Sequence, residues 1–78
     1  MEKTFGQTLH ELRHELKMSL RVLSILSGLS IMTLSNLEND KYKPRALTVM
    51  KLIEPLQCEV VMGKKNIYLK RKENKYGN

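Results

Sequence analysis

The stretch from Ser19 to Glu38 constrains the fold most, because a single glycine separates two short apolar segments there. Gly28 can adopt the left-handed backbone conformation that ends a helix, and the hydroxyl of Ser30 can cap the helix that follows. The small side chain of Ser24 would let the two helices cross closely at the turn. The stretch therefore predicts two short helices joined by a tight corner.

Helical spacing continues on both sides of this corner. Thr4 and Gln7 predict a T-x-x-Q capping box, followed by a first helix over Phe5–Leu16. This helix should turn Phe5, Leu9, Leu12 and Leu16 towards the core. The paired helices are expected to run from the cap Ser19 to Gly28 and from Ser30 to about Asn39. Such a pair is a helix-turn-helix, in which the second helix enters the major groove of DNA. An ordinary helical hairpin is the alternative.

The C-terminal third predicts one more helix and then extended chain. The helix is expected to bury Ala46, Val49, Met50 and Ile53 on one face. Pro55 disfavours a helical conformation at Glu54, so this helix should end or kink there. Cys58, Val60 and Met62 then alternate, Gly63–Asn66 favours a turn, and Ile67 and Leu69 alternate again. Either a hairpin or one extended strand fits this pattern.

The order of these motifs resembles the lambda-repressor and Cro-type helix-turn-helix family. The resemblance is carried by GQTLHELR, TLSNLEND and KPRALTVMKLIEPL, and it extends from Phe5 to about Val60. The next stretch, LQCEVVMGKKN, looks like the strand that follows the helices in HipB-type antitoxins. The resemblance implies an all-α bundle of four to five short helices with a C-terminal β-strand or hairpin. Residues 1–57 would be the DNA-binding domain, and residues 58–78 a β extension with a basic tail.

The resemblance also implies which side chains contact double-stranded DNA. Asn36 can pair bidentately with adenine, whereas Ile31 and Met32 can contact only apolar base edges, which favours A·T-rich half-sites. The expected DNA-contacting residues are Ser19, Arg21, Ser30, Ile31, Met32, Thr33, Ser35, Asn36, Lys41 and Lys43. An amphipathic helix that merely exposes these residues is the alternative.

Two other positions follow from the resemblance. Arg13 and Glu38 match residues that form a partly buried ion pair between the first and third helices, so their role would be structural. Leu20 occupies a position after the helix cap where such proteins usually carry Gln.

The helix from Ser19 to Gly28 is apolar on almost every face, because Val22, Ile25 and Leu26 fill positions that are commonly charged. An exposed helix of this kind should be covered by protein. The expected dimer or partner interface comprises Ile25, Leu26, Val60, Met62, Ile67 and Leu69, with the C-terminal strand pairing across a homodimer. A helix that is simply over-apolar in a tolerant small protein is the alternative.

His10-Glu11-Leu12-Arg13-His14 spells the zinc-protease motif H-E-x-x-H. The buried stripe of this helix would turn His10, Glu11 and His14 outward, and no third protein ligand or substrate groove is evident. We therefore expect no metal site, no cofactor and no enzymatic activity.

Composition bounds the remaining choices. With 78 residues and 41% hydrophobic residues, the chain fits one small domain that dimerisation could stabilise. Its net charge of +6 is uneven: residues 1–60 contribute 8 − 7 = +1 and residues 61–78 contribute 6 − 1 = +5. The basic C-terminal segment could bind DNA phosphates or an acidic protein partner. A terminus that only increases solubility is the alternative.

The single cysteine, Cys58, is expected to be a buried and unreactive side chain, since one cysteine excludes an internal disulfide. The chain has no apolar run of membrane-spanning length, and its start is not a signal peptide, so a cytoplasmic location is expected. Together these features predict a homodimeric DNA-binding transcriptional regulator, in the first place a repressor of a palindromic operator. The HipB-type resemblance implies an antitoxin whose partner is a HipA-like kinase toxin. A protein-interaction module with weak DNA binding is the competing class.

Overall fold

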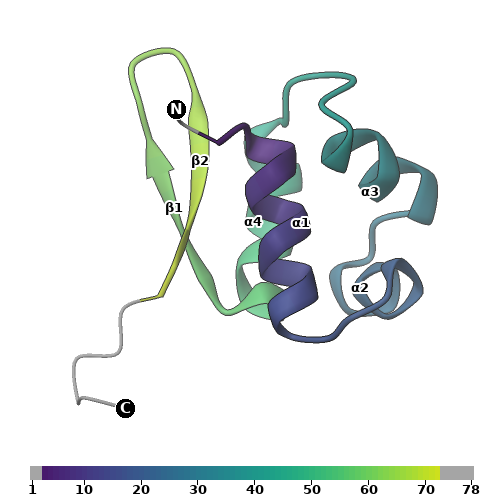
Figure 1. Ribbon diagram of the computed structural model, residues 1–78. Helices are drawn as coiled ribbons and strands as arrows, with labels where there is room; N and C mark the ends of the chain where they lie inside the picture. Colours follow the sequence, from purple (N-terminus) through teal and green to yellow (C-terminus); the bar gives the residue numbers. More distant parts are fainter. Residues whose placement is uncertain (1–2, 73–78) are drawn as a thin grey trace.

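Residues 3–72, which the computed structural model describes, form four helices and a two-stranded antiparallel sheet (Figure 1). The elements are α1 (Phe5–Glu15), α2 (Leu20–Ser27), α3 (Ile31–Glu38), α4 (Ala46–Leu56), β1 (Cys58–Met62) and β2 (Ile67–Arg71). Helices α1 and α4 lie in the middle, with α2 and α3 on one side and the hairpin on the other. The hairpin therefore packs on the side of the central helices that faces away from α2 and α3.

The helix ends follow the expected capping residues. Thr4 and Gln7 form the capping box of α1, and the hydroxyls of Ser19 and Ser30 cap α2 and α3. Gly28 ends α2 with a φ of +79°. These predicted boundaries are confirmed, except that Leu16 is the C-cap of α1 and is exposed instead of facing the core.

One core joins all six elements. Its members are Phe5, Leu9, Leu12, Leu23, Leu34, Leu37, Val49, Leu52, Leu56, Cys58 and Leu69. Cys58 is buried, as expected, and this burial raises the pKa of its thiol because the charged thiolate is disfavoured away from water. The strands thus complete the core of the helical bundle.

Helix α4 differs from its prediction in two ways. It continues through Pro55 to Leu56, so the expected end at Glu54 is wrong. Pro55 lies in the last turn, where it removes a single donor, and the burial of Leu56 offsets that loss. Gln57 then ends the helix in the left-handed conformation, with a φ of +50°.

The buried face of α4 was also misplaced by the sequence pattern. The side chains in the core are Val49, Leu52 and Leu56, which recur at helical spacing, whereas Met50 and Ala46 are exposed. Ile53 is half-buried at the edge of this face. The apolar residues of α4 outnumber those that one face can bury, so the pattern alone did not identify the correct stripe.

The C-terminal strands pair with each other. Val60 lies opposite Leu69, and Met62 opposite Ile67. The N–H of Gly63 donates to the Asn66 carbonyl at 2.8 Å and closes the turn. Of the two arrangements that the sequence allowed, the hairpin is the one observed.

Within residues 3–72, no single helix is both long and apolar enough to cross a membrane. Helices α2 and α3 reach the necessary length and composition only as a pair, and that pair is bent by 114°.

Candidate nucleic-acid interface

The corner between α2 and α3 is built by side-chain hydrogen bonds. The hydroxyl of Ser24 donates to the Leu29 carbonyl at 2.6 Å, and the hydroxyl oxygen of Ser27 accepts from the Leu29 N–H at 3.1 Å. Ser24 therefore does more than provide space at the crossing. The angle of 114° between α2 and α3 lies in the range of about 90–120° that is typical of helix-turn-helix units.

Helix α3 has one buried and one open face. Leu34 and Leu37 fix it to the core, while Ile31 and Met32 are exposed, Met32 to 74%. Asn36 is half-buried. The side chains at the start and middle of α3 are thus accessible to a macromolecular partner.

The cap of α3 uses part of the hydrogen-bonding capacity of this face. The Ser30 hydroxyl accepts from the Thr33 N–H at 3.0 Å and donates to the Thr33 hydroxyl oxygen at 2.9 Å. The Thr33 hydroxyl keeps its own proton, so it can still donate to a phosphate oxygen.

None of the ten residues expected to contact DNA lies in the core. Seven of them are exposed: Ser19, Arg21, Ser30, Ile31, Met32, Lys41 and Lys43. The other three, Thr33, Ser35 and Asn36, are half-buried. They come from the start of α2, from α3 and from the loop that follows α3. Their contact with DNA remains a prediction.

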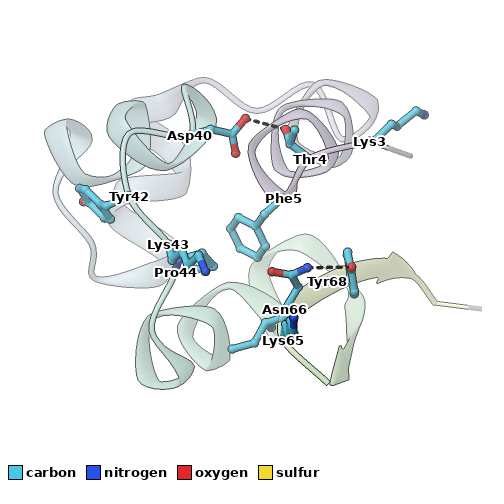
Figure 2. A pocket seen from close by; sticks show the side chains of 11 residues that line it. Lys3, Thr4, Phe5, Asp40, Tyr42, Lys43, Pro44, Lys65, Asn66 and Tyr68 are labelled. Atoms are coloured by element: carbon cyan, nitrogen blue, oxygen red, sulfur yellow. Dashed lines mark hydrogen bonds between the residues drawn. The ribbon is translucent and has the colours of Figure 1, made fainter. Parts of the chain in front are cut away.

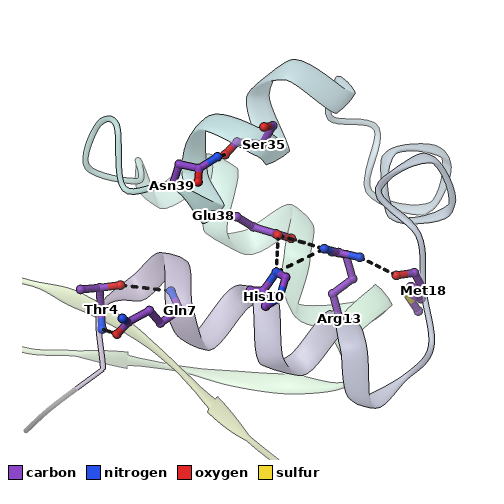
Figure 3. Close-up of polar contacts among 8 residues, drawn as sticks. All are labelled: Thr4, Gln7, His10, Arg13, Met18, Ser35, Glu38 and Asn39. Atoms are coloured by element: carbon purple, nitrogen blue, oxygen red, sulfur yellow. Dashed lines mark hydrogen bonds and ion pairs between the residues drawn. The ribbon is translucent and has the colours of Figure 1, made fainter.

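Arg13 and Glu38 join α1 to the end of α3 (Figure 3). Arg13 Nε donates to Glu38 Oε2 at 2.6 Å and Arg13 Nη2 donates to Oε1 at 3.0 Å, with both side chains about nine-tenths buried. A third bond runs from Arg13 Nη1 to the Met18 carbonyl at 2.7 Å. This arrangement holds α3 against α1.

The same contacts set the charge states of the pair. Burial raises the pKa of Glu38, but the hydrogen bonds from Arg13 and His10 together outweigh it, so that the pKa lies below its ordinary value. The hydrogen bond to Glu38 raises the pKa of Arg13, partly opposed by burial. Both groups are therefore charged near neutral pH.

His10 and His14 of the H-E-x-x-H motif are exposed, as expected, and Glu11 is half-buried. His10 Nδ1 lies 2.9 Å from Glu38 Oε1, so His10 contacts α3, and the rings of His10 and His14 have centroids 4.2 Å apart. Among residues 3–72, no group of three His, Cys, Asp or Glu side chains is placed to hold a metal ion.

Asp40 is a structural anchor that the sequence pattern did not reveal. Its Oδ1 accepts from the Gly6 N–H at 2.9 Å and its Oδ2 accepts from the Thr4 hydroxyl at 2.5 Å. These bonds tie the first turn of α1 to Asp40, which lies two residues beyond the end of α3. The one available signal was an isolated glycine inside a helical pattern, which often marks close packing.

The loop between α3 and α4 carries a dense basic run, K-Y-K-P-R. Lys41, Tyr42, Lys43 and Arg45 are all exposed. Within the described part of the chain, the ion pairs are Lys3–Glu11, His10–Glu38, Arg13–Glu38 and Arg71–Glu15, so the cations of this loop keep their charges free. Tyr42 and Arg45 were missed as candidates for phosphate contact, although they belong to the same run.

Within residues 3–72, no other element covers the outer side of α2. Ile25 is 74% exposed, and Val22 and Leu26 are also exposed. Helix α4 adds Leu47 and Met50 to the large exposed apolar side chains. Exposure of this extent is consistent with the expected protein contact at α2, which remains a prediction.

The hairpin residues of the expected interface differ from one another. Met62 is 68% exposed, but Leu69 is only 6% exposed and lies in the core, so the expectation that Leu69 is available to a partner is wrong. Val60 and Ile67 are half-buried against the core. The inward side of the hairpin faces the helices of its own chain because β2 packs on α1.

The basic C-terminal segment is only partly described, since residues 73–78 lie outside the described range. Arg71 pairs with Glu15 of α1, which lowers the pKa of Glu15 through that hydrogen bond and raises the pKa of Arg71. The strands lie across α1 and α4 from α3 (Figure 1). Their charges are therefore remote from the open face of α3, and Lys65 at the hairpin turn lies near the loop that follows α3.

Comparison with known proteins agrees with this geometry. A family model described as helix-turn-helix (HTH_3) matches residues 9–61. The uncharacterised HTH-type transcriptional regulator RghRB of Bacillus subtilis strain 168 is 41% identical over 54 residues, which cover 68% of this chain and 39% of that protein. The structure of the restriction-modification controller protein C.AhdI from Aeromonas hydrophila is similar with a TM-score of 0.65 and 32% identity, covering 68% of this chain and 80% of that chain. This chain therefore belongs to the helix-turn-helix family of that model, whose similar proteins include transcriptional regulators.

Proposed function

We propose that the protein represses transcription by binding a palindromic DNA operator as a homodimer. The observation that carries this proposal is the open face of α3, held at 114° to α2 and followed by the free cations of the 41–45 loop. In this proposal α3 enters the major groove, and Asn36 pairs with an adenine edge. Arg21 and the loop cations contact the phosphate backbone on either side.

A second copy of the chain is the proposed cover for the apolar side of α2. Ile25 and Leu26 of α2 expose large apolar side chains. A twofold axis would bury both copies of this surface and place two α3 helices about 34 Å apart, one helical turn of DNA. Dimerisation would also double the number of phosphate contacts.

Selection from a random pool of duplex DNA tests the DNA-binding part. We expect an enriched palindrome with A·T-rich half-sites whose centres are about ten base pairs apart. Affinity for this site should fall steeply between about 50 and 200 mM salt, because phosphate contacts release counterions. Recovery of no preferred sequence would reject a specific operator.

Sedimentation tests the dimer. Leu26→Asp should shift the protein towards monomer and weaken binding to a full site more than to a half-site, since tethering of the second domain is lost. Met62→Asp places the same charge on the exposed hairpin residue of the expected interface and tests the hairpin as the alternative contact. If only the Met62 variant dissociates, the interface belongs to the hairpin.

A second candidate function is a protein-interaction module, including an antitoxin that neutralises a HipA-like kinase. The observation that favours it is the apolar character of Ile31 and Met32 at the positions that would face DNA. Such a module would bind duplex DNA weakly and without a steep salt dependence. The selection experiment therefore separates the two candidates.

We further propose that the chain has no catalytic role and works in the cytoplasm, where an operator would be found. His10 is engaged with Glu38, which opposes a zinc-protease role for the H-E-x-x-H residues. Stoichiometric zinc that survived dialysis would contradict this part of the proposal.

A further inference from the structure

A pocket of about 470 Å³ opens where three separate segments meet (Figure 2). The segments are the start of α1, the loop after α3 and the hairpin turn, and the pocket shares Lys43 with the basic loop described above. The lining residues that matter here are Phe5, Asp40, Lys43, Pro44, Lys65 and Asn66. A volume of this size lies within the range of about 300–1,000 Å³ that is typical of small-molecule sites.

Flat apolar groups form the middle of the pocket. The ring of Phe5 points into it from α1, and Pro44 lies across from the hairpin turn (Figure 2). Phe5 is otherwise part of the core, so its ring is held in place by packing. Because Phe5 is only 9% exposed, a planar ring would lie mainly against Pro44 and contact the part of the Phe5 ring that stays open.

Two free cations flank this apolar surface. Lys43 comes from the loop after α3 and Lys65 from the hairpin turn, and both are exposed and without an ion-pair partner among residues 3–72. Lys3 extends away from the pocket and pairs with Glu11 at 2.6 Å. Both lysines line the pocket, which therefore carries two ammonium groups from different segments.

The remaining polar groups restrict where that anion can sit. The carboxylate of Asp40 lies on the α1 side, where its oxygens accept from Thr4 and Gly6, and it would repel an anion there. Asn66 Nδ2 donates to the Tyr68 hydroxyl at 3.2 Å, which leaves the Asn66 amide oxygen free to accept from a ligand N–H.

We propose that this pocket binds a free nucleoside monophosphate. The base would lie against Phe5 and Pro44, with its N–H edge towards the amide oxygen of Asn66. The phosphate would lie between Lys43 and Lys65, on the side away from Asp40. A planar ring, a hydrogen-bonding edge and an anionic group are the three features that these residues match, and a nucleotide carries all three.

This binding would regulate the proposed function, on which this step rests, because Lys43 is also an expected DNA contact. One ammonium group cannot neutralise a nucleotide phosphate and a DNA phosphate fully at the same time. The nucleotide should therefore lower the affinity for DNA, by the loss of about one phosphate contact.

Amide chemical-shift mapping of the free full chain tests the pocket directly. Adenosine, guanosine, cytidine and uridine 5′-monophosphates are titrated to about 10 mM, a range that detects millimolar affinity. We expect saturable shifts at the amides of Lys43, Lys65 and Asn66 with at least one of the four. Adenosine and inorganic phosphate, which each lack one half of the ligand, should bind at least tenfold more weakly. Shifts that do not saturate, or that map outside the pocket, would overturn the proposal.

Matched variants separate a built site from general charge attraction. Lys43→Gln and Lys65→Gln should each weaken binding about three- to tenfold. Lys51→Gln and Lys70→Gln make the same change at exposed lysines outside the pocket and should leave binding unchanged. Equal weakening by all four variants would overturn the proposal, and unchanged amide spectra away from each substitution would show that the variants fold.

The effect on DNA is measured separately, by fluorescence anisotropy with the selected operator. Saturating nucleotide should weaken DNA binding severalfold in the wild type and have little effect in Lys43→Gln. Unchanged affinity would overturn the shared use of Lys43. If no DNA binds at all, the proposed repressor function fails, whereas the shift mapping still decides whether the pocket binds nucleotide.

Discussion

The N–H of Gly6 in α1 donates to the Asp40 carboxylate at 2.9 Å, although 34 positions separate the two residues. A Cβ atom at Gly6 would lie 2.5 Å from the carbonyl oxygens of both Leu37 and Glu38. Real Cβ atoms essentially never approach other atoms so closely, so only glycine fits at this position. The contact sets how closely α1 approaches the C-terminal end of the recognition helix.

Gly6→Ala should therefore destabilise the fold by about 2 kcal/mol, because the overpacked backbone must move. Gly28 provides the contrast, since its φ is +79° and a Cβ there meets nothing within 4 Å. Asparagine tolerates the left-handed conformation, so Gly28→Asn should cost less than Gly28→Ala. At Gly6 asparagine should cost at least as much as alanine. Urea unfolding of the four variants measures these differences, and a milder Gly6→Asn would contradict the steric explanation.

Removing one partner of the Arg13–Glu38 pair should leave a buried charge. Arg13→Met is expected to lower the free energy of unfolding by about 3 kcal/mol. The double variant Arg13→Met/Glu38→Leu removes both charges and should regain a large part of this loss. Chemical denaturation of both proteins measures the difference. Equal losses in the single and double variants would show that the bond from Arg13 to the Met18 carbonyl dominates.

The depressed pKa of Glu38 predicts a loss of stability in acid. In the unfolded chain the carboxyl titrates near its ordinary value of 4.5, and in the folded protein it titrates lower. The contribution of Glu38 is therefore fully present above about pH 4.5 and is lost as the pH falls through the folded pKa. Glu38→Gln should flatten this part of the stability profile, measured by denaturation from pH 6 downward. An unchanged acid limb would mean that other carboxylates cause the loss.

Asn36→Ala should weaken specific operator binding by about 1–3 kcal/mol, because it removes a bidentate contact to one base. Asn66→Ala removes the same amide from the hairpin turn and should leave affinity unchanged. Fluorescence anisotropy on the selected site measures both. Identical affinities for Asn36→Ala and wild type would show that the base-reading face of α3 lies elsewhere.

The hairpin should behave as part of the core. Leu69→Ala is expected to cost about 2–5 kcal/mol of unfolding free energy, since the side chain is 6% exposed and its loss leaves a cavity. Met62→Ala, on the same inward side but 68% exposed, should change stability by less than about 0.5 kcal/mol. Thermal denaturation of both variants compares them. A stable Leu69→Ala protein would imply that the hairpin can detach from the helices.

Local chemistry explains why most of the fold was predictable. The caps Thr4, Ser19 and Ser30 and the terminator Gly28 act on their own neighbours in the chain, so the boundaries of α1, α2 and α3 follow from adjacent residues. Helix α4 was less predictable because tertiary packing decided it. The burial of Leu56 keeps the helix intact past Pro55, and no local signal reports that burial.

The site shows the same division. The open face of α3 follows from the spacing of Leu34 and Leu37, which a sequence reveals directly. Asp40, in contrast, acts on residues more than thirty positions away, and Gly6 matters only because α1 approaches the end of α3 so closely. The pocket between Lys43 and Lys65 likewise depends on how the hairpin folds back towards the start of α1.

The placement of Leu69 in the core has a consequence for how this protein is made. Synthesis proceeds from the N-terminus, and domains tend to fold as units once their residues are available. Here all four helices precede β2 in the chain, yet the core that they form lacks Leu69 until β2 pairs with β1 and packs on α1. During translation the helix-turn-helix segment therefore leaves the ribosome with an open apolar gap beside α1, and β2, which is made after it, closes this gap. Until then the nascent chain is most exposed to chaperones and proteases.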